Sequence, residues 1–119
     1  MDWPRWLFRA TSTLAAVMLF DQAIFAGQFL AGGYDALHTH RVNATYAGIS
    51  VLVSAVAGLL VRVPGRGPWW PLVANLGVFG LVALQIALGF ARVIAVHVPL
   101  GVTTILFATG TAILAWRRL

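Results

Sequence analysis

The chain has 119 residues, of which 61% are hydrophobic and 9% charged, with a formal net charge of +5 and no cysteine. The lack of cysteine excludes structural disulfides and thiolate metal sites, and the lack of any long polar stretch excludes a separate soluble domain. We therefore expect a single transmembrane domain that spans residues 1–119 and lies in the lipid bilayer.

Four apolar segments follow one another along the chain. Each is about 20 residues long, which is the length needed to cross a bilayer as a helix. We place them roughly at 7–31, 40–62, 70–91 and 94–116. Their connections are short, which forces neighbouring helices to run antiparallel. The sequence therefore predicts an all-α fold, an integral membrane four-helix bundle with up-down-up-down topology.

The arginines mark one side of the membrane. Six of them flank the N-terminus, the middle connection and the C-terminus, and only two lie in the other connections: Arg5, Arg9, Arg62, Arg66, Arg117 and Arg118 against Arg41 and Arg92. The tryptophans fall at the same interface, as in an aromatic belt. This bias predicts a multi-pass protein of a prokaryotic cell membrane with both termini cytoplasmic. The net charge thus reflects orientation, and we expect no nucleic-acid partner.

The first segment carries an ionisable residue, Asp21, near mid-membrane. A charge there is costly and is by default a functional-site hypothesis, normally turned toward the bundle interior. Two interpretations stay open. Asp21 is either protonated or bonded to Gln22 or a neighbouring helix, or it serves a proton-coupled site.

A motif at the end of the first segment returns at the end of the third. Gln28 is followed by Gly32 and His40, and Gln85 by Gly89 and His97, with the same spacings and a constant offset of 57 residues. A shared period of that size indicates an internal duplication. We place the halves at about 1–62 and 63–119, as two parallel helix-hairpin repeats related by an axis along the membrane normal. His40 and His97 should then face each other across that axis.

Two opposed imidazoles suit a flat cofactor with one axial ligand on each side, such as haem with two histidine ligands. Gln28 and Gln85 could orient those ligands or bond the cofactor. Arg41 and Arg92 could pair with haem propionates. The site would lie near the outer face of the membrane.

Each of these residues also has a plainer interpretation. The histidines could simply reach for water at the interface or bind another transition metal. The glutamines could bond between helices, and the arginines could extend to the membrane surface. His38 has no counterpart, since Ala95 stands at the matching position. It is a spare ligand, a proton carrier or a solvated residue.

Two of these stretches resemble the heme A synthase family. His40-Arg41 resembles the His-Arg at the second helix of its four-helix halves, and Gln85-Ile-Ala-Leu-Gly89, followed by His97-Val-Pro-Leu-Gly101, resembles the stretch that leads into the fourth-helix histidine. The resemblance covers most of the chain, as a single four-helix half. It implies b-type haem held by His40 and His97. Leu37 stands where the family usually carries glutamate, and the family's cysteine pair is missing.

Three functions follow as hypotheses. The first is a small membrane cytochrome that binds haem b and works in electron transfer, with a redox partner, or in haem modification; whether it is an enzyme, such as an oxidoreductase, stays open. The second is a proton-coupled small-molecule transporter that uses Asp21. The third is a non-enzymatic membrane subunit or assembly factor, whose small-residue helix faces could also support a homo-oligomer.

Overall fold

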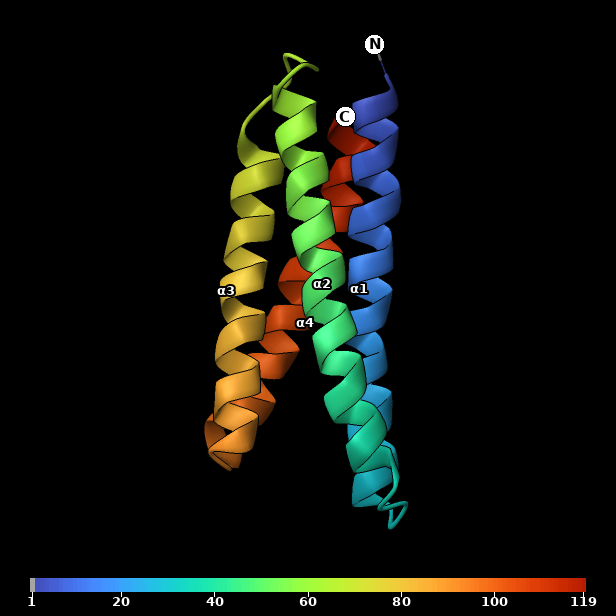
Figure 1. Ribbon diagram of the computed structural model, residues 1–119, viewed down its shortest axis with the longest axis vertical. Helices are drawn as coiled ribbons and strands as arrows, with labels where there is room; N and C mark the ends of the chain where they lie inside the picture. The colour runs from blue at the N-terminus through green and yellow to red at the C-terminus, as the bar shows by residue number, and fades with distance from the viewer. Residues whose placement is uncertain (1) are drawn as a thin grey trace.

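A computed structural model describes residues 2–119, which form four α-helices and no strand. The helices are α1 (Trp3–Leu30), α2 (Ala36–Arg62), α3 (Trp70–Phe90) and α4 (Ile94–Arg118). Consecutive helices run antiparallel in a bundle 49 Å long and 20 Å across, and both termini lie at the same end (Figure 1). The predicted all-α four-helix bundle is confirmed.

Two helices begin earlier than the sequence predicted. α1 starts at Trp3 rather than near residue 7, because Pro4 fits the first helical turn, where its missing N–H costs no hydrogen bond. α2 starts at Ala36 rather than near residue 40. Asp35 occupies its N-cap position, but the carboxylate makes no capping hydrogen bond within the described chain. His38 and His40 therefore lie in the first turns of α2.

The helices are long and apolar enough to cross a membrane, with 28, 27, 21 and 25 residues, where about 20 suffice. Large apolar side chains cover the outside of the bundle. Val73, Leu106 and Phe107 are each at least 60% exposed, which suits contact with lipid and not with water. The chain is a multi-pass membrane protein.

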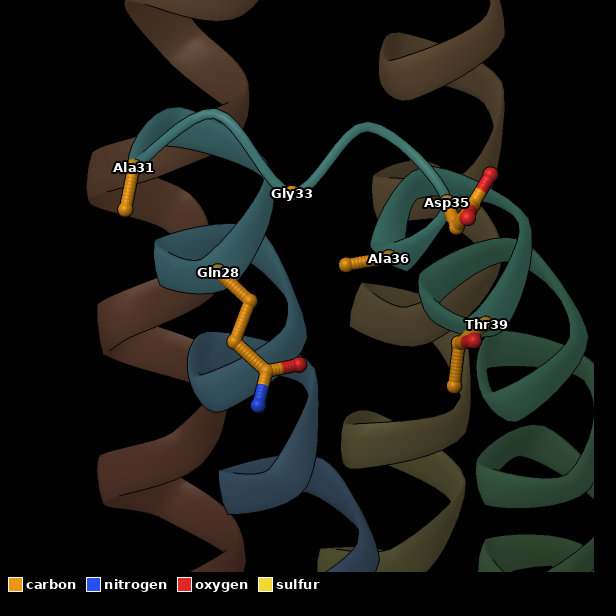
Figure 2. A pocket seen from close by; sticks show the side chains of 6 residues that line it. All are labelled: Gln28, Ala31, Gly33, Asp35, Ala36 and Thr39. Atoms are coloured by element: carbon orange, nitrogen blue, oxygen red, sulfur yellow. The ribbon is translucent and has the colours of Figure 1, made fainter.

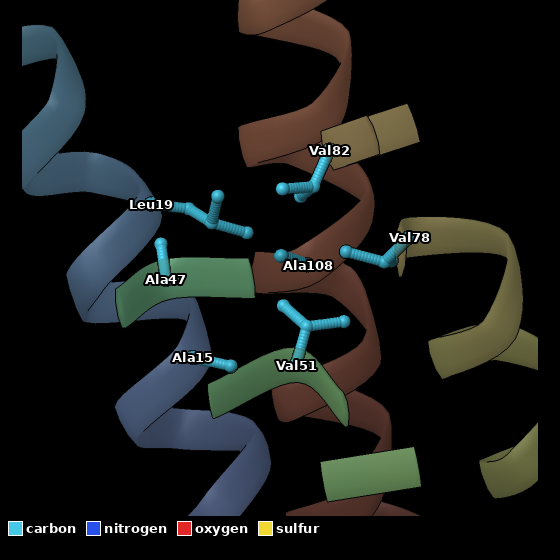
Figure 3. Close-up of a cluster of buried hydrophobic side chains, with 7 residues drawn as sticks. All are labelled: Ala15, Leu19, Ala47, Val51, Val78, Val82 and Ala108. Carbon is cyan, nitrogen blue, oxygen red and sulfur yellow. The ribbon is translucent and has the colours of Figure 1, made fainter. Parts of the chain in front are cut away.

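The helices pack as a ring around a narrow core. α1 and α3 each pack against both α2 and α4, so α2 and α4 are diagonal partners. At mid-bundle all four helices contribute small or branched side chains to one cluster: Ala15, Leu19, Ala47, Val51, Val78, Val82 and Ala108 (Figure 3). A second cluster lies nearer the termini and consists of Phe8, Ala57, Val61 and Ala115.

Burial within the bundle stops halfway along its length. The buried residues of α1 end at Leu19 and those of α2 begin at Ala47; those of α3 end at Val82 and those of α4 begin at Thr104. Beyond them, toward the α1–α2 and α3–α4 connections, the two helical hairpins diverge (Figure 1). We call this half the open end, and the half that holds both termini the packed end.

Candidate functional site

The structure brings two imidazoles together at the open end. His40 lies on α2 and His97 on α4, the diagonal partners of the bundle. Their ring centres are 6.2 Å apart and their planes are inclined by 72°. Both side chains are half-buried. Histidines 57 residues apart in sequence thus form one site between the two hairpins.

Each imidazole is oriented by a main-chain carbonyl of the preceding helix. Nδ1 of His40 lies 3.0 Å from the carbonyl oxygen of Gln22, and Nδ1 of His97 lies 3.0 Å from that of Gln85. A carbonyl oxygen can only accept, so in a neutral ring Nδ1 carries the proton and Nε2 keeps its lone pair. Metal-binding histidines are held in the same way, with one ring nitrogen donating to a carbonyl or carboxylate.

In the first hairpin, hydrogen bonds fix the helix that carries His40. Asn43 lies one turn beyond His40 on α2, and its Nδ2 donates to the carbonyl of Met18 at 3.0 Å and to Oε1 of Gln22 at 2.9 Å. α2 is therefore tied to α1 at two successive turns. The Gln22 residue takes part in both ties, through its carbonyl and through its side chain.

In the second hairpin, close packing takes the place of those bonds. A Cβ on Gly89 would lie 3.2 Å from Cε1 of His97, so the ring rests against the backbone of α3. A Cβ on Gly101 would lie 2.7 Å from Nε2 of Gln85, so this amide rests against α4. Leu100 stands three residues after His97, as Asn43 stands after His40.

Because Leu100 offers no donor, Oε1 of Gln85 is buried without a hydrogen-bond partner among residues 2–119. Leaving a buried acceptor unsatisfied costs about 1–3 kcal/mol. The Gln85 amide therefore lies in the α3–α4 contact with one acceptor unsatisfied.

The two arginines predicted for the site lie at the open end. Arg41 is exposed, and its guanidinium stacks over the ring of Phe90 at 5.4 Å, which links α2 to the end of α3. Arg92 is exposed in the α3–α4 connection, with a positive φ of 59°. Neither pairs with a carboxylate of the described chain.

Gln28 lies elsewhere. Its side chain lines an open hollow of about 490 Å³ at the α1–α2 connection, together with Asp35 and Thr39 (Figure 2). Gln22, not Gln28, meets the first histidine. The reason is the connections: residues 31–35 separate α1 from α2, but only residues 91–93 separate α3 from α4. Gln28 and Gln85 therefore precede their histidines by the same number of residues, but only Gln85 lies beside its histidine.

His38 and Asp21 do not join the pair of imidazoles. His38 is exposed on the first turns of α2. Asp21 is half-buried on the same face of α1 as the exposed Leu14, Val17 and Ile24, which is not the interior face. Its carboxylate makes no hydrogen bond or ion pair with any residue from 2 to 119.

The predictions from sequence assigned neither Gln22 nor Asn43 a role beside the pair of imidazoles. The sequence does contain a sign that Asn43 matters, because an amide one turn beyond a histidine in an apolar helix needs a hydrogen-bond partner. It contains none for Gln22, since that residue acts on His40 through its main-chain carbonyl, a group that every residue possesses.

The donor set limits what the site can hold. Across residues 2–119, no three or more of His, Asp and Glu gather into a group that could hold a metal ion. A cofactor whose metal needs only two protein ligands fits the pair; a bare cation that needs four does not. Comparison of the chain with family models, curated proteins and solved structures found no match.

Proposed function

We propose that the protein is a small membrane haem protein in which His40 and His97 are the two axial ligands of a b-type haem. The observation that carries this proposal is the matched pair of imidazoles, each with Nδ1 bonded to a carbonyl and the rings 6.2 Å apart. In both rings Nε2 keeps its lone pair, which would be donated to the haem iron if the cofactor binds between them.

The surroundings of the pair support a large apolar cofactor. No residue from 20 to 46 or from 83 to 103 is buried, so the open end has no packed core of its own. The hairpins diverge there. A porphyrin between them would cover apolar side chains that the protein alone leaves half-exposed, and burial of apolar surface is favourable at about 25 cal/mol per Å².

Charge at the open end supports the same proposal. Arg41 and Arg92 are not paired with a carboxylate of the described residues, and guanidinium matches the geometry of haem propionates. Gln85 orients His97 through its carbonyl. Asn43 and Gln22 hold His40 in place.

Bound haem would supply one-electron chemistry, and the chain's residues would hold the iron, balance the propionates and keep water from the ring. We infer a role in electron transfer or in haem modification, which the resemblance to the heme A synthase family supports. The arginine-rich packed end would face the cytoplasm, which places the histidines near the outer surface, within reach of a redox partner there.

An absorption spectrum tests the proposal. Purified after expression with adequate haem, the protein should show a Soret band and the sharp reduced bands of a six-coordinate b-type haem. His40→Ala and His97→Ala should each abolish the six-coordinate spectrum. His38→Ala is the matched control and should leave it unchanged. A colourless wild-type protein with correct folding would refute the proposal.

A further inference from the structure

A second constellation lies at the packed end, where α1 meets α4. The guanidinium of Arg9 sits over the ring of Trp6 at 4.7 Å and over that of Trp116 at 5.5 Å. The two indoles are themselves in edge-to-face contact, with centres 5.5 Å apart. Nε1 of Trp116 donates to Oγ1 of Thr13 at 3.0 Å, which fixes that ring across the seam. The guanidinium is therefore held in one place by both helices.

The Arg9 guanidinium has N–H donors that form no hydrogen bond within residues 2–119. An arginine offers five N–H donors, and within the described chain Arg9 uses one of them, from Nε to the carbonyl of Ala115 at 3.4 Å. The Nη donors have no acceptor among residues 2–119. A rigid guanidinium with free donors is suited to an oxyanion, because little side-chain freedom is lost on binding.

The charge around Arg9 is strongly one-sided. Arg5 precedes it by one turn, and Arg117 and Arg118 follow Trp116 at the end of α4. Asp2 is the one acidic residue in the segments at this end, and it is paired with Arg5 at 3.2 Å. This distribution of charge favours an anion over a cation at the α1–α4 seam.

We infer that the α1–α4 seam binds the phosphate of an anionic phospholipid headgroup. Trp6 and Trp116 are about half-exposed on the outside of the bundle, as interfacial aromatic residues are. Below them the apolar faces of α1 and α4 continue into the hydrocarbon region. The free Nη donors of Arg9 match two phosphate oxygens, and Arg117 and Arg118 add attraction. This inference does not depend on haem binding.

Native mass spectrometry and thermal unfolding can test the site in nanodiscs. Nanodiscs of phosphatidylcholine alone are compared with nanodiscs that also contain phosphatidylglycerol. The wild-type protein should retain phosphatidylglycerol selectively and unfold at a higher temperature in its presence. Arg9→Gln should reduce the selectivity about fivefold, the factor that corresponds to about 1 kcal/mol for one arginine near an anionic surface.

Three further arms make the outcome decisive. Arg41→Gln is the matched control, because that guanidinium also stacks on an aromatic ring but lies at the open end; it should keep the selectivity. If Arg9→Gln fails to fold, the double variant Arg117→Gln, Arg118→Gln should lose selectivity instead. Inorganic phosphate added to phosphatidylcholine nanodiscs should not raise the unfolding temperature. Equal retention of both lipids by the wild type, equal losses in Arg9→Gln and Arg41→Gln, or full stabilisation by inorganic phosphate would each overturn the inference.

Discussion

At the scale of single residues, the two histidines have the same kind of hydrogen-bond partner, a main-chain carbonyl, but their rings pack differently. Both donate from Nδ1 to a carbonyl at 3.0 Å. Only His97 lies against a glycine, Gly89, close enough that a methyl group would press on the ring. The His97 ring can take this orientation because Gly89 has no side chain. Gly89 is therefore as important to the site as the residues that form hydrogen bonds with the histidines.

Gly89→Ala should weaken haem binding while leaving the helix itself intact. The new methyl group would lie 3.2 Å from Cε1 of His97, so the ring must move by a few tenths of an ångström. Changes around a metal ligand of this kind lower affinity by roughly 10–100-fold. Haem titration followed in the Soret region measures the effect.

Gly80→Ala is the control for that experiment. Gly80 also lies in α3, but a Cβ there meets no atom within 4 Å. It should leave haem affinity unchanged, since it gains only the helix preference of alanine over glycine, about 1 kcal/mol. If both variants bind haem as the wild type does, His97 is not held by α3 in the way described.

At the scale of helices, different neighbouring pairs are joined by different kinds of contact. α1 and α2 are tied by the two bonds from Asn43, whereas α2 and α3 approach through Gly58, where a Cβ would lie 2.7 Å from the backbone nitrogen of Leu72. Hydrogen bonds between membrane helices contribute about 0.6 kcal/mol each on average. Tight backbone contact tolerates no added atom. The α1–α2 contact at the open end thus relies on hydrogen bonds, and the α2–α3 contact at the packed end relies on a small residue.

Asn43→Leu should lower haem affinity more than it lowers the stability of the bundle. The substitution removes both hydrogen bonds from Asn43 to α1, which should cost about 1 kcal/mol of stability in total, and it leaves His40 held only by its own bond to the Gln22 carbonyl. We expect at least a tenfold loss of haem affinity and partial conversion to a five-coordinate spectrum. Thr103→Val is a fair comparison, because its hydroxyl bonds only to Pro99 in its own helix; it should change neither quantity.

Gly58→Ala should lower the stability of the bundle more than it lowers haem affinity. Because the added methyl group meets backbone atoms of Pro71 and Leu72 at 2.7–3.0 Å, α2 and α3 must separate. Overpacking of this kind costs about 1–3 kcal/mol, which thermal unfolding in detergent can detect. Gly77→Ala, where a Cβ meets open space, should unfold at the wild-type temperature or above. Equal stability of the two variants would contradict the close α2–α3 approach.

At the scale of the whole molecule, the orientation in the membrane can be tested directly because the chain has no cysteine. Single substitutions Arg66→Cys and Leu119→Cys lie at the packed end, and Asp35→Cys lies at the open end. In intact cells an impermeant thiol reagent should label only the Asp35→Cys protein. After lysis it should label all three. Labelling of Arg66→Cys from outside would reverse the proposed orientation.

The sequence predicted the fold and the histidine pair through two different patterns, the length of the apolar segments and the repeated spacing. Four apolar segments of membrane-spanning length admit few arrangements, and short connections made neighbours antiparallel. The shared offset led from His40 to His97, which the structure brings within 6.2 Å. The same offset pointed to Gln28 and missed Gln22, because register between helices depends on connection length and packing. Those are properties of the assembled chain, which residue spacing does not encode.

The halt of burial at Leu19, Ala47, Val82 and Thr104 has a consequence for assembly. Toward the termini the four helices pack around buried side chains; toward the α1–α2 and α3–α4 connections no residue is buried, so separating the tips of the two hairpins would break no buried contact. A flat molecule dissolved in the membrane could then enter sideways between the tips after the polypeptide has been inserted. If haem is taken up there, backbone amides near the tips should exchange with solvent deuterium faster before uptake than after it.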